Sequence, residues 1–107
     1  MGSTRRIDLC AADEVAPGTM RMAWVDGTEP VLVANVEGTI RAVSGVCTHE
    51  YFELDTGFLA GRNVTCSLHL SRFDLVTGKA LEPPASDPLE VYPVSVEGGR
   101  VLIDFPG

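Results

Sequence analysis

The chain has 107 residues, of which 45% are hydrophobic and 21% charged, a balance that is typical of a folded protein and excludes a disordered one. Fifteen acidic and eight basic residues give a net charge of −7, which repels phosphate backbones and anionic lipid. We therefore expect neither nucleic acid nor a membrane as a partner. The apolar runs fall far short of the roughly 20 residues that span a bilayer, so we expect no transmembrane anchor.

The N-terminal segment contains a pattern that resembles an export signal. Arg5 and Arg6 are placed like a twin-arginine motif, but residues 7–14 include three acidic side chains where such a signal needs an apolar stretch. We therefore expect a cytoplasmic protein. Cys10 has no second cysteine and no histidine nearby, and we interpret it as a small apolar core residue.

The first half of the chain predicts short strands. Turn residues interrupt nearly every segment before an amphipathic helix of three turns could form. Residues 20–25 and 30–36 are rich in β-formers and are separated by the turn sequence Asp-Gly-Thr-Glu, which predicts a hairpin. A turn at residues 37–39 then leads into a further strand at residues 40–43.

The C-terminal part repeats this pattern. Residues 90–97 and 100–105 flank a Gly-Gly pair and predict a second hairpin. Between the hairpins lies a less regular region, in which residues 63–66 and 72–76 are predicted strands. No linker, repeat or low-complexity tract divides the chain, so we expect one all-β domain of small antiparallel sheets over residues 1–107.

Cysteine and histidine form two close pairs within the irregular region. The sequence reads C-T-H at residues 47–49 and, after sixteen intervening residues, C-S-L-H at residues 66–69. These pairs use both histidines of the chain and two of its three cysteines, which predicts a metal site. An odd number of cysteines without a secretion signal argues against a disulfide framework.

Two kinds of metal centre suit these side chains. Two thiolates and two imidazoles fit tetrahedral zinc as well as iron–sulfur chemistry. A zinc site of this composition usually pairs like with like, whereas a Rieske centre takes one cysteine and one histidine from each of two loops. The pairs here are Cys47 with His49 and Cys66 with His69, which favours the Rieske centre. A zinc-stabilised interaction module is the alternative, and a visible spectrum distinguishes the two because zinc protein is colourless.

The motif resembles the C-x-H…C-x-x-H signature of Rieske proteins. A downstream stretch resembles the ferredoxins of bacterial ring-hydroxylating dioxygenases. It consists of Arg72-Phe73-Asp74, Thr77-Gly78-Lys79-Ala80 and Pro83-Pro84-Ala85. The resemblance covers residues 46–105, and before residue 46 it lies in length and strand pattern. It implies a Rieske-like fold with a two-loop cluster-binding subdomain at about residues 44–88.

The same resemblance implies one Rieske [2Fe–2S] cluster and its ligands. Cys47 and Cys66 would bind the buried iron, and His49 and His69 would bind the outer iron at an exposed tip. The function implied is that of a soluble one-electron carrier between an NAD(P)H-dependent ferredoxin reductase and a terminal ring-hydroxylating oxygenase. Both partners would dock transiently, and we expect a monomer. A small Rieske-like subunit of another oxidoreductase, such as nitrite reductase, is the alternative.

We do not expect an enzyme. A mononuclear iron oxygenase needs a further 2-His-1-carboxylate triad, and both histidines are already used. The sequence also lacks the glycine-rich motifs that bind a nicotinamide or a nucleoside triphosphate.

Three positions near the motif bear on the reduction potential. High-potential Rieske proteins carry a disulfide cysteine where this chain has Leu68 and a tyrosine where it has Phe73. The resemblance therefore implies the low end of the Rieske range, roughly −150 mV. Ser71, in contrast, matches a serine of the high-potential group whose hydroxyl reaches a bridging sulfide. The alternative for Ser71 is a loop serine bonded to the backbone.

Two further features have both a functional and a plain interpretation. The Pro83-Pro84 pair either shields the cluster from water or marks a turn. Glu50, Glu53 and Asp55 follow the first motif and either steer a partner or are simply solvated.

Overall fold

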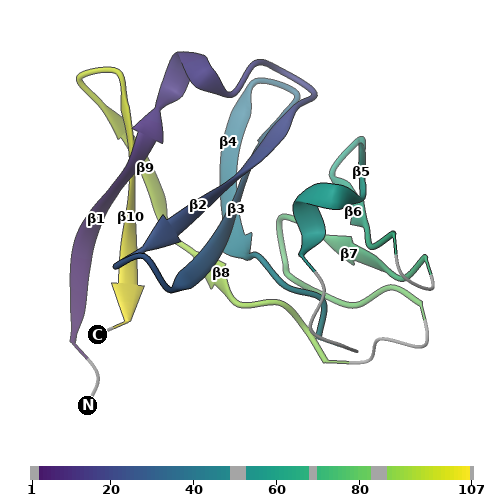
Figure 1. Cartoon of the computed structure of the whole chain (residues 1–107). Coiled ribbons are helices and arrows are strands. Elements are labelled where there is room, and N and C mark those ends of the chain that lie inside the picture. Colours follow the sequence, from purple (N-terminus) through teal and green to yellow (C-terminus); the bar gives the residue numbers. More distant parts are fainter. Residues whose placement is uncertain (1–2, 49–52, 68–69, 83–86, 107) are drawn as a thin grey trace.

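The structure, a computed structural model, describes residues 3–48, 53–67, 70–82 and 87–106 (Figure 1). Within these ranges the chain forms ten strands and two short 3-10 helices, arranged in three antiparallel sheets, which confirms the all-β prediction. The elements are β1 (Thr4–Ala11), η1 (Ala12–Glu14), β2 (Met20–Val25), β3 (Glu29–Val36), β4 (Thr39–Ser44), η2 (Leu54–Thr56), β5 (Phe58–Ala60), β6 (Asn63–Thr65), β7 (Arg72–Asp74), β8 (Val91–Tyr92), β9 (Val94–Glu97) and β10 (Arg100–Pro106). Among the described residues no helix has the length and apolar character needed to cross a bilayer.

The four-stranded sheet β2-β3-β4-β8 lies between two cores. Successive side chains of a strand point to opposite faces, so β3 serves both cores. Leu32 and Ala34 pack into one core, together with residues of the small sheet β5-β6-β7. Val31 and Val33 pack into the other, together with residues of the sheet β1-β10-β9. Figure 1 shows the small sheet on one side of the molecule and β1, β9 and β10 on the other.

Cys10 lies in the core next to the sheet β1-β10-β9. Only 4% of its surface is exposed, and burial raises the pKa of its thiol above the ordinary value. The prediction that Cys10 is an apolar core residue is therefore confirmed.

Two-residue turns close the β3–β4 hairpin and the predicted C-terminal hairpin, whereas residues 26–28 form a three-residue turn that closes the predicted β2–β3 hairpin. Glu37 and Gly38 have φ values of 54° and 95°, and Gly98 and Gly99 have values of 58° and 76°. Positive φ at both central residues is the type I′ geometry, whose twist matches that of the flanking strands. The predicted hairpins are confirmed, with β2 matching its predicted bounds.

Pro93 corrects the prediction of a single strand over residues 90–97. Proline has no N–H to donate to a ladder, and the chain changes sheets at this residue. Before it, β8 pairs with β4, and after it, β9 pairs with β10. The sequence predicts neither β1, which is mostly exposed and has charged residues in its first half, nor β5, which has only three residues.

The small sheet belongs to an insert between β4 and β8, which we define as residues 45–89. The chain leaves the larger sheet at Ser44 and returns at Glu90, and the Ser44 amide donates to the Glu90 carbonyl at 2.9 Å. The insert thus coincides closely with the irregular region of the sequence. Its predicted strand at residues 72–76 ends early, at Asp74, because the Asp74 side chain accepts the amides of Val76 and Thr77 and forms a turn.

Candidate cluster-binding site

The structure buries the two predicted cysteine ligands in one core. Cys47 follows β4, Cys66 follows β6, and their exposed fractions are 4% and 0%. Both pack in the core that contains Leu54 and Phe73. Neither cysteine forms a disulfide. Two thiols that lie far apart in the sequence are therefore presented within one apolar shell.

The loop that follows Cys47 is closed at its base by backbone contacts. Val46 forms a bridge with Glu53, and the Leu54 amide donates to the Gly45 carbonyl at 2.9 Å. Gly45 packs closely here, since a Cβ at this position would displace the end of the Met22 side chain and lie 3.0 Å from the carbonyl carbon of Pro30. The chain therefore enters and leaves this loop at fixed points.

The loop that follows Cys66 is closed in a similar way. The Cys66 amide donates to the Ser71 carbonyl at 2.7 Å, and Leu70 adopts a φ of 60° to complete the reversal. A left-handed leucine is uncommon. Just before the loop, Gly57 approaches Thr65 so closely that a Cβ would lie 1.8 Å from its carbonyl oxygen.

Two side-chain hydrogen bonds join these loops to other segments of the insert, one from Thr48 and one between Thr56 and Ser67, and we call them the hydroxyl latches. The Thr48 hydroxyl donates to the Asp87 carbonyl at 2.7 Å, and the Thr56 and Ser67 hydroxyls lie 3.1 Å apart. Thr48 and Ser67 occupy variable positions of the Cys/His signature. Sequence reasoning missed both latches, and the hydroxyl side chains at these positions were the available signal.

Several predicted residues lie outside the described part of the chain. These are His49, Glu50, Leu68, His69, Pro83 and Pro84. The structure therefore brings Cys47 and Cys66 together and leaves the histidine ligands, the proline shield and part of the acidic group as predictions.

Ser71 and Phe73, the other residues singled out near the motif, are fully buried. Of the predicted acidic group, Glu53 is half-buried and Asp55 is exposed. Large apolar side chains are also exposed on the insert, most strongly Phe58 and Leu70 at 57% and 60%. The insert therefore carries both charged and apolar surface.

Asp74 is a buried charged residue in the described part of the insert. Burial alone would raise its pKa, but the amides of Val76 and Thr77 and the guanidinium of Arg62 outweigh burial and hold the pKa below the ordinary value. The carboxylate thereby fixes the turn after β7 and joins it to the turn between β5 and β6.

Two closed loops that each present a buried thiol beside a small antiparallel sheet define an all-β, two-loop metal protein. Residues 5–93 match the Rieske [2Fe-2S] domain, and the chain belongs to this family. Family membership favours iron–sulfur chemistry over a zinc-stabilised module.

The chain is similar to ferredoxins over nearly its whole length. It is 43% identical over 99 residues to the ferredoxin component of the naphthalene 1,2-dioxygenase system of Pseudomonas aeruginosa, covering 92% of this chain and 94% of that protein. The Sphingomonas yanoikuyae B1 ferredoxin superposes with a TM-score of 0.89 at 31% identity, covering 95% and 100% of the two chains. A chain from the structure of the complex of reduced oxygenase and oxidized ferredoxin in carbazole 1,9a-dioxygenase superposes with a TM-score of 0.87 at 32% identity, covering 92% of each chain.

The residues present fit the group that the family implies. The iron of such a cluster takes thiolate ligands, and the insert supplies two buried cysteines from two separate loops. Cys10 lies in the other core and supplies none. The chain therefore carries one Rieske-type [2Fe–2S] cluster.

Proposed function

We propose that the chain is the ferredoxin component of an aromatic ring-hydroxylating dioxygenase system, carrying single electrons from an NAD(P)H-dependent reductase to a terminal oxygenase. The observation that carries this proposal is the 43% identity to a dioxygenase ferredoxin over nearly all of both chains. Such components transfer electrons and are not themselves the catalytic oxygenases, which agrees with a chain that has no second metal-binding motif.

Cys47, His49, Cys66 and His69 are the proposed cluster ligands. The burial of both cysteines in one core supports their assignment to the inner iron, and the signature supports the two histidines. When bound, the cluster supplies one reversible electron at a higher potential than an all-cysteine cluster. Neutral imidazoles explain the difference, because they bring less negative charge to the site than thiolates do.

The insert is the proposed docking face for both partners. Exposed Leu70 follows the proposed ligand His69 directly, and Phe58 exposes a large ring on the same insert. Exposed apolar side chains at such a site favour contact with another protein. Asp55 adds negative charge that suits a basic partner surface. We further propose a monomer located in the cytoplasm, and the similarity to ferredoxin components over nearly their whole length supports a freely diffusing carrier.

Ligand identity is tested by single substitutions. His49→Ala and His69→Ala should each abolish the Rieske absorption and electron paramagnetic resonance spectra, because each removes one of four iron ligands. Cys10→Ser is the matched control for Cys47→Ser, and only the latter should bleach the protein. A Cys10→Ser protein that is bleached as fully as Cys47→Ser would overturn the assignment.

The carrier role is tested with the two kinds of partner. After reduction by a dioxygenase-type reductase, this protein should be reoxidised by a terminal ring-hydroxylating oxygenase in stopped-flow mixing. On gel filtration, this protein and the oxygenase should separate, because they bind only transiently. The nitrite reductase alternative expects lasting association with a large subunit instead. Stable co-purification with such a subunit, with no reoxidation by the oxygenase, would contradict the proposal.

A further inference from the structure

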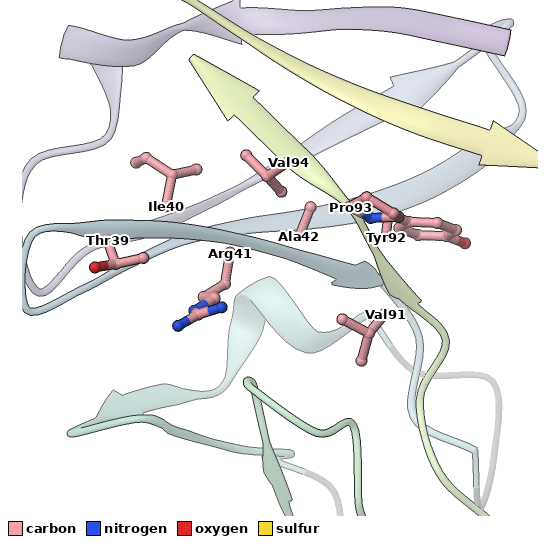
Figure 2. Close-up of a pocket in the computed structure, with 8 residues that line it drawn as sticks. All are labelled: Thr39, Ile40, Arg41, Ala42, Val91, Tyr92, Pro93 and Val94. Atoms are coloured by element: carbon pink, nitrogen blue, oxygen red, sulfur yellow. The ribbon is translucent and has the colours of Figure 1, made fainter.

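The opening shown in Figure 2 lies outside the insert. It is lined by residues 39–42 and 91–94, and Ile40 and Arg41 project from β4 to opposite faces of the sheet. It therefore provides no contact surface near the cysteine loops, and the insert itself has to provide one.

The small sheet β5-β6-β7 carries a cross-strand row of four side chains. Phe58 on β5 pairs with Thr65 on β6, which pairs with Arg72 on β7. Leu81 continues the row, because its amide donates to the Arg72 carbonyl at 2.8 Å and the adjacent bridge belongs to the same ladder. Residues directly opposite each other in an antiparallel ladder point to the same face. We call Phe58, Thr65, Arg72 and Leu81 the outer row.

The outer row points away from the core. Val64 and Phe73, in the neighbouring row of the same sheet, are fully buried, and Leu59 packs against them. Since side chains alternate between the faces of a sheet, the outer row faces solvent. Phe58 and Leu81 are accordingly 57% and 40% exposed.

The outer row carries no net charge. Arg72, its charged member, donates from Nε to Glu82 at 2.8 Å, so apolar side chains flank a neutral ion pair. Glu53 and Asp55, which follow the first cysteine loop, instead contribute negative charge. The insert therefore offers two kinds of surface to a partner, one neutral and partly apolar and one acidic.

The outer row lies at the base of the second cysteine loop. Thr65 immediately precedes Cys66, and Arg72 immediately follows Ser71, whose carbonyl accepts the Cys66 amide at 2.7 Å. Leu70, within this loop, is 60% exposed. A protein interface of standard size covers about 800 Å² on each partner, so a protein bound to the outer row would also cover the loop.

We propose that the outer row is the contact surface for the reductase, which rests on the proposed carrier function. The reductase must bind the oxidised protein, give its cluster one electron, and release the reduced protein, which is more negative by one charge. Attraction to a basic surface strengthens with that charge and delays release. Contact between apolar side chains does not depend on it. The oxygenase must instead bind the more negative, reduced protein, for which the acidic surface is suited.

Stopped-flow measurement of both half-reactions tests the proposal with the cluster-containing protein. Phe58→Ala should lower the second-order rate constant for reduction by a dioxygenase-type reductase about tenfold, because truncating an aromatic side chain within an interface commonly costs this much. Leu81→Ala should also lower it, and neither variant should change the rate of oxidation by the oxygenase. Val96→Ala is the control, since Val96 is 50% exposed on β9 outside the insert, and it should change neither rate.

Titration calorimetry measures binding without electron transfer. The oxidised Phe58→Ala protein should bind the reductase about tenfold more weakly than wild type. Its absorption spectrum and reduction potential should be unchanged, which separates lost contact from a damaged cluster site.

Three results would overturn the proposal: equal losses in both half-reactions, a loss with the oxygenase alone, or no loss of affinity for the reductase. Equal losses would make the outer row a surface shared by both partners. A wild-type protein that exchanges electrons with neither partner would instead contradict the proposed carrier function.

Discussion

Ser71 is fully buried two residues after the proposed ligand His69, and its backbone carbonyl closes the second loop on Cys66. If its hydroxyl donates to a bridging sulfide, it stabilises the reduced, more negative cluster more than the oxidised one. A hydrogen bond to a charged acceptor contributes roughly 1.5–3 kcal/mol, and only the difference between oxidation states counts. Since moving one charge through 100 mV corresponds to ~2.3 kcal/mol, Ser71→Ala should lower the potential by several tens of millivolts.

Voltammetry of both proteins at one pH measures this shift. Ser95→Ala, on β9 outside the insert, is the control and should leave the potential unchanged. An unchanged potential in Ser71→Ala would assign Ser71 the role of an ordinary loop residue.

Asp74 predicts a pH dependence of stability. Its pKa is lowered in the folded state, so its carboxylate stabilises the fold above its ordinary pKa of about 3.9, and this contribution disappears as the pH falls through the lower folded-state value. Asp74→Asn should therefore reduce stability by about 1–2 kcal/mol at neutral pH and by progressively less below about pH 4.

Thermal melting of the cluster-containing protein across a pH series tests this prediction. Asp13→Asn, at an exposed position of η1, serves as the control. A difference between Asp74→Asn and wild type that stays constant down to pH 2 would show that the charge of Asp74 is not the cause.

The two cysteine loops depend on contacts between elements as well as on their own backbone. Thr48→Val removes the hydroxyl latch to Asp87 while keeping the size of the side chain. The net contribution of such a bond is about 0.5–1.5 kcal/mol, so loss of the cluster to a chelator should become roughly two- to tenfold faster. The cluster itself should still assemble with an ordinary spectrum.

Thr19→Val provides a closely matched control for the latch. The Thr19 hydroxyl also donates to a backbone carbonyl at 2.7 Å, but it does so in the turn before β2. Its removal should leave the rate of cluster loss unchanged. Equal rates in both variants would show that the Thr48 latch does not hold the cluster loops.

At the scale of the elements, a feature could be predicted from the sequence when adjacent residues determine it, and not when it depends on distant segments. The hairpins could be predicted because short turns with positive φ are encoded by adjacent residues such as Gly98-Gly99. The change of sheet at Pro93 could not, because its pairing with β4 and then β10 involves distant segments. The cysteine pair was predictable from spacing, whereas the latch partner Asp87 lies 39 residues from Thr48 and belongs to no signature.

At the scale of the whole molecule, the net charge of −7 predicts a salt effect on electron transfer. Steering by charge raises association rates by tenfold or more at low salt, and the Debye length shortens from about 30 Å at 0.01 M to about 8 Å at 0.15 M. The rate of electron transfer to the oxygenase should therefore fall steeply over this range. Asp55→Asn, next to the first loop, should reduce the slope more than Asp13→Asn does.

Stopped-flow rates over a series of salt concentrations measure that slope. A rate that does not change with salt would leave the acidic surface with solubility as its only role.

The insert and the chain ends occupy opposite sides of the molecule. Ser44 and Glu90 meet at a single backbone hydrogen bond where the insert begins and ends, while Thr4 pairs with Pro106 at the far side (Figure 1). Residues 45–89 are therefore a natural unit for exchange between ferredoxins, since the two junctions already lie side by side. A tether to an electrode at either terminus would hold the protein by the side away from the insert, so the proposed electron-exchange surface would face the solution.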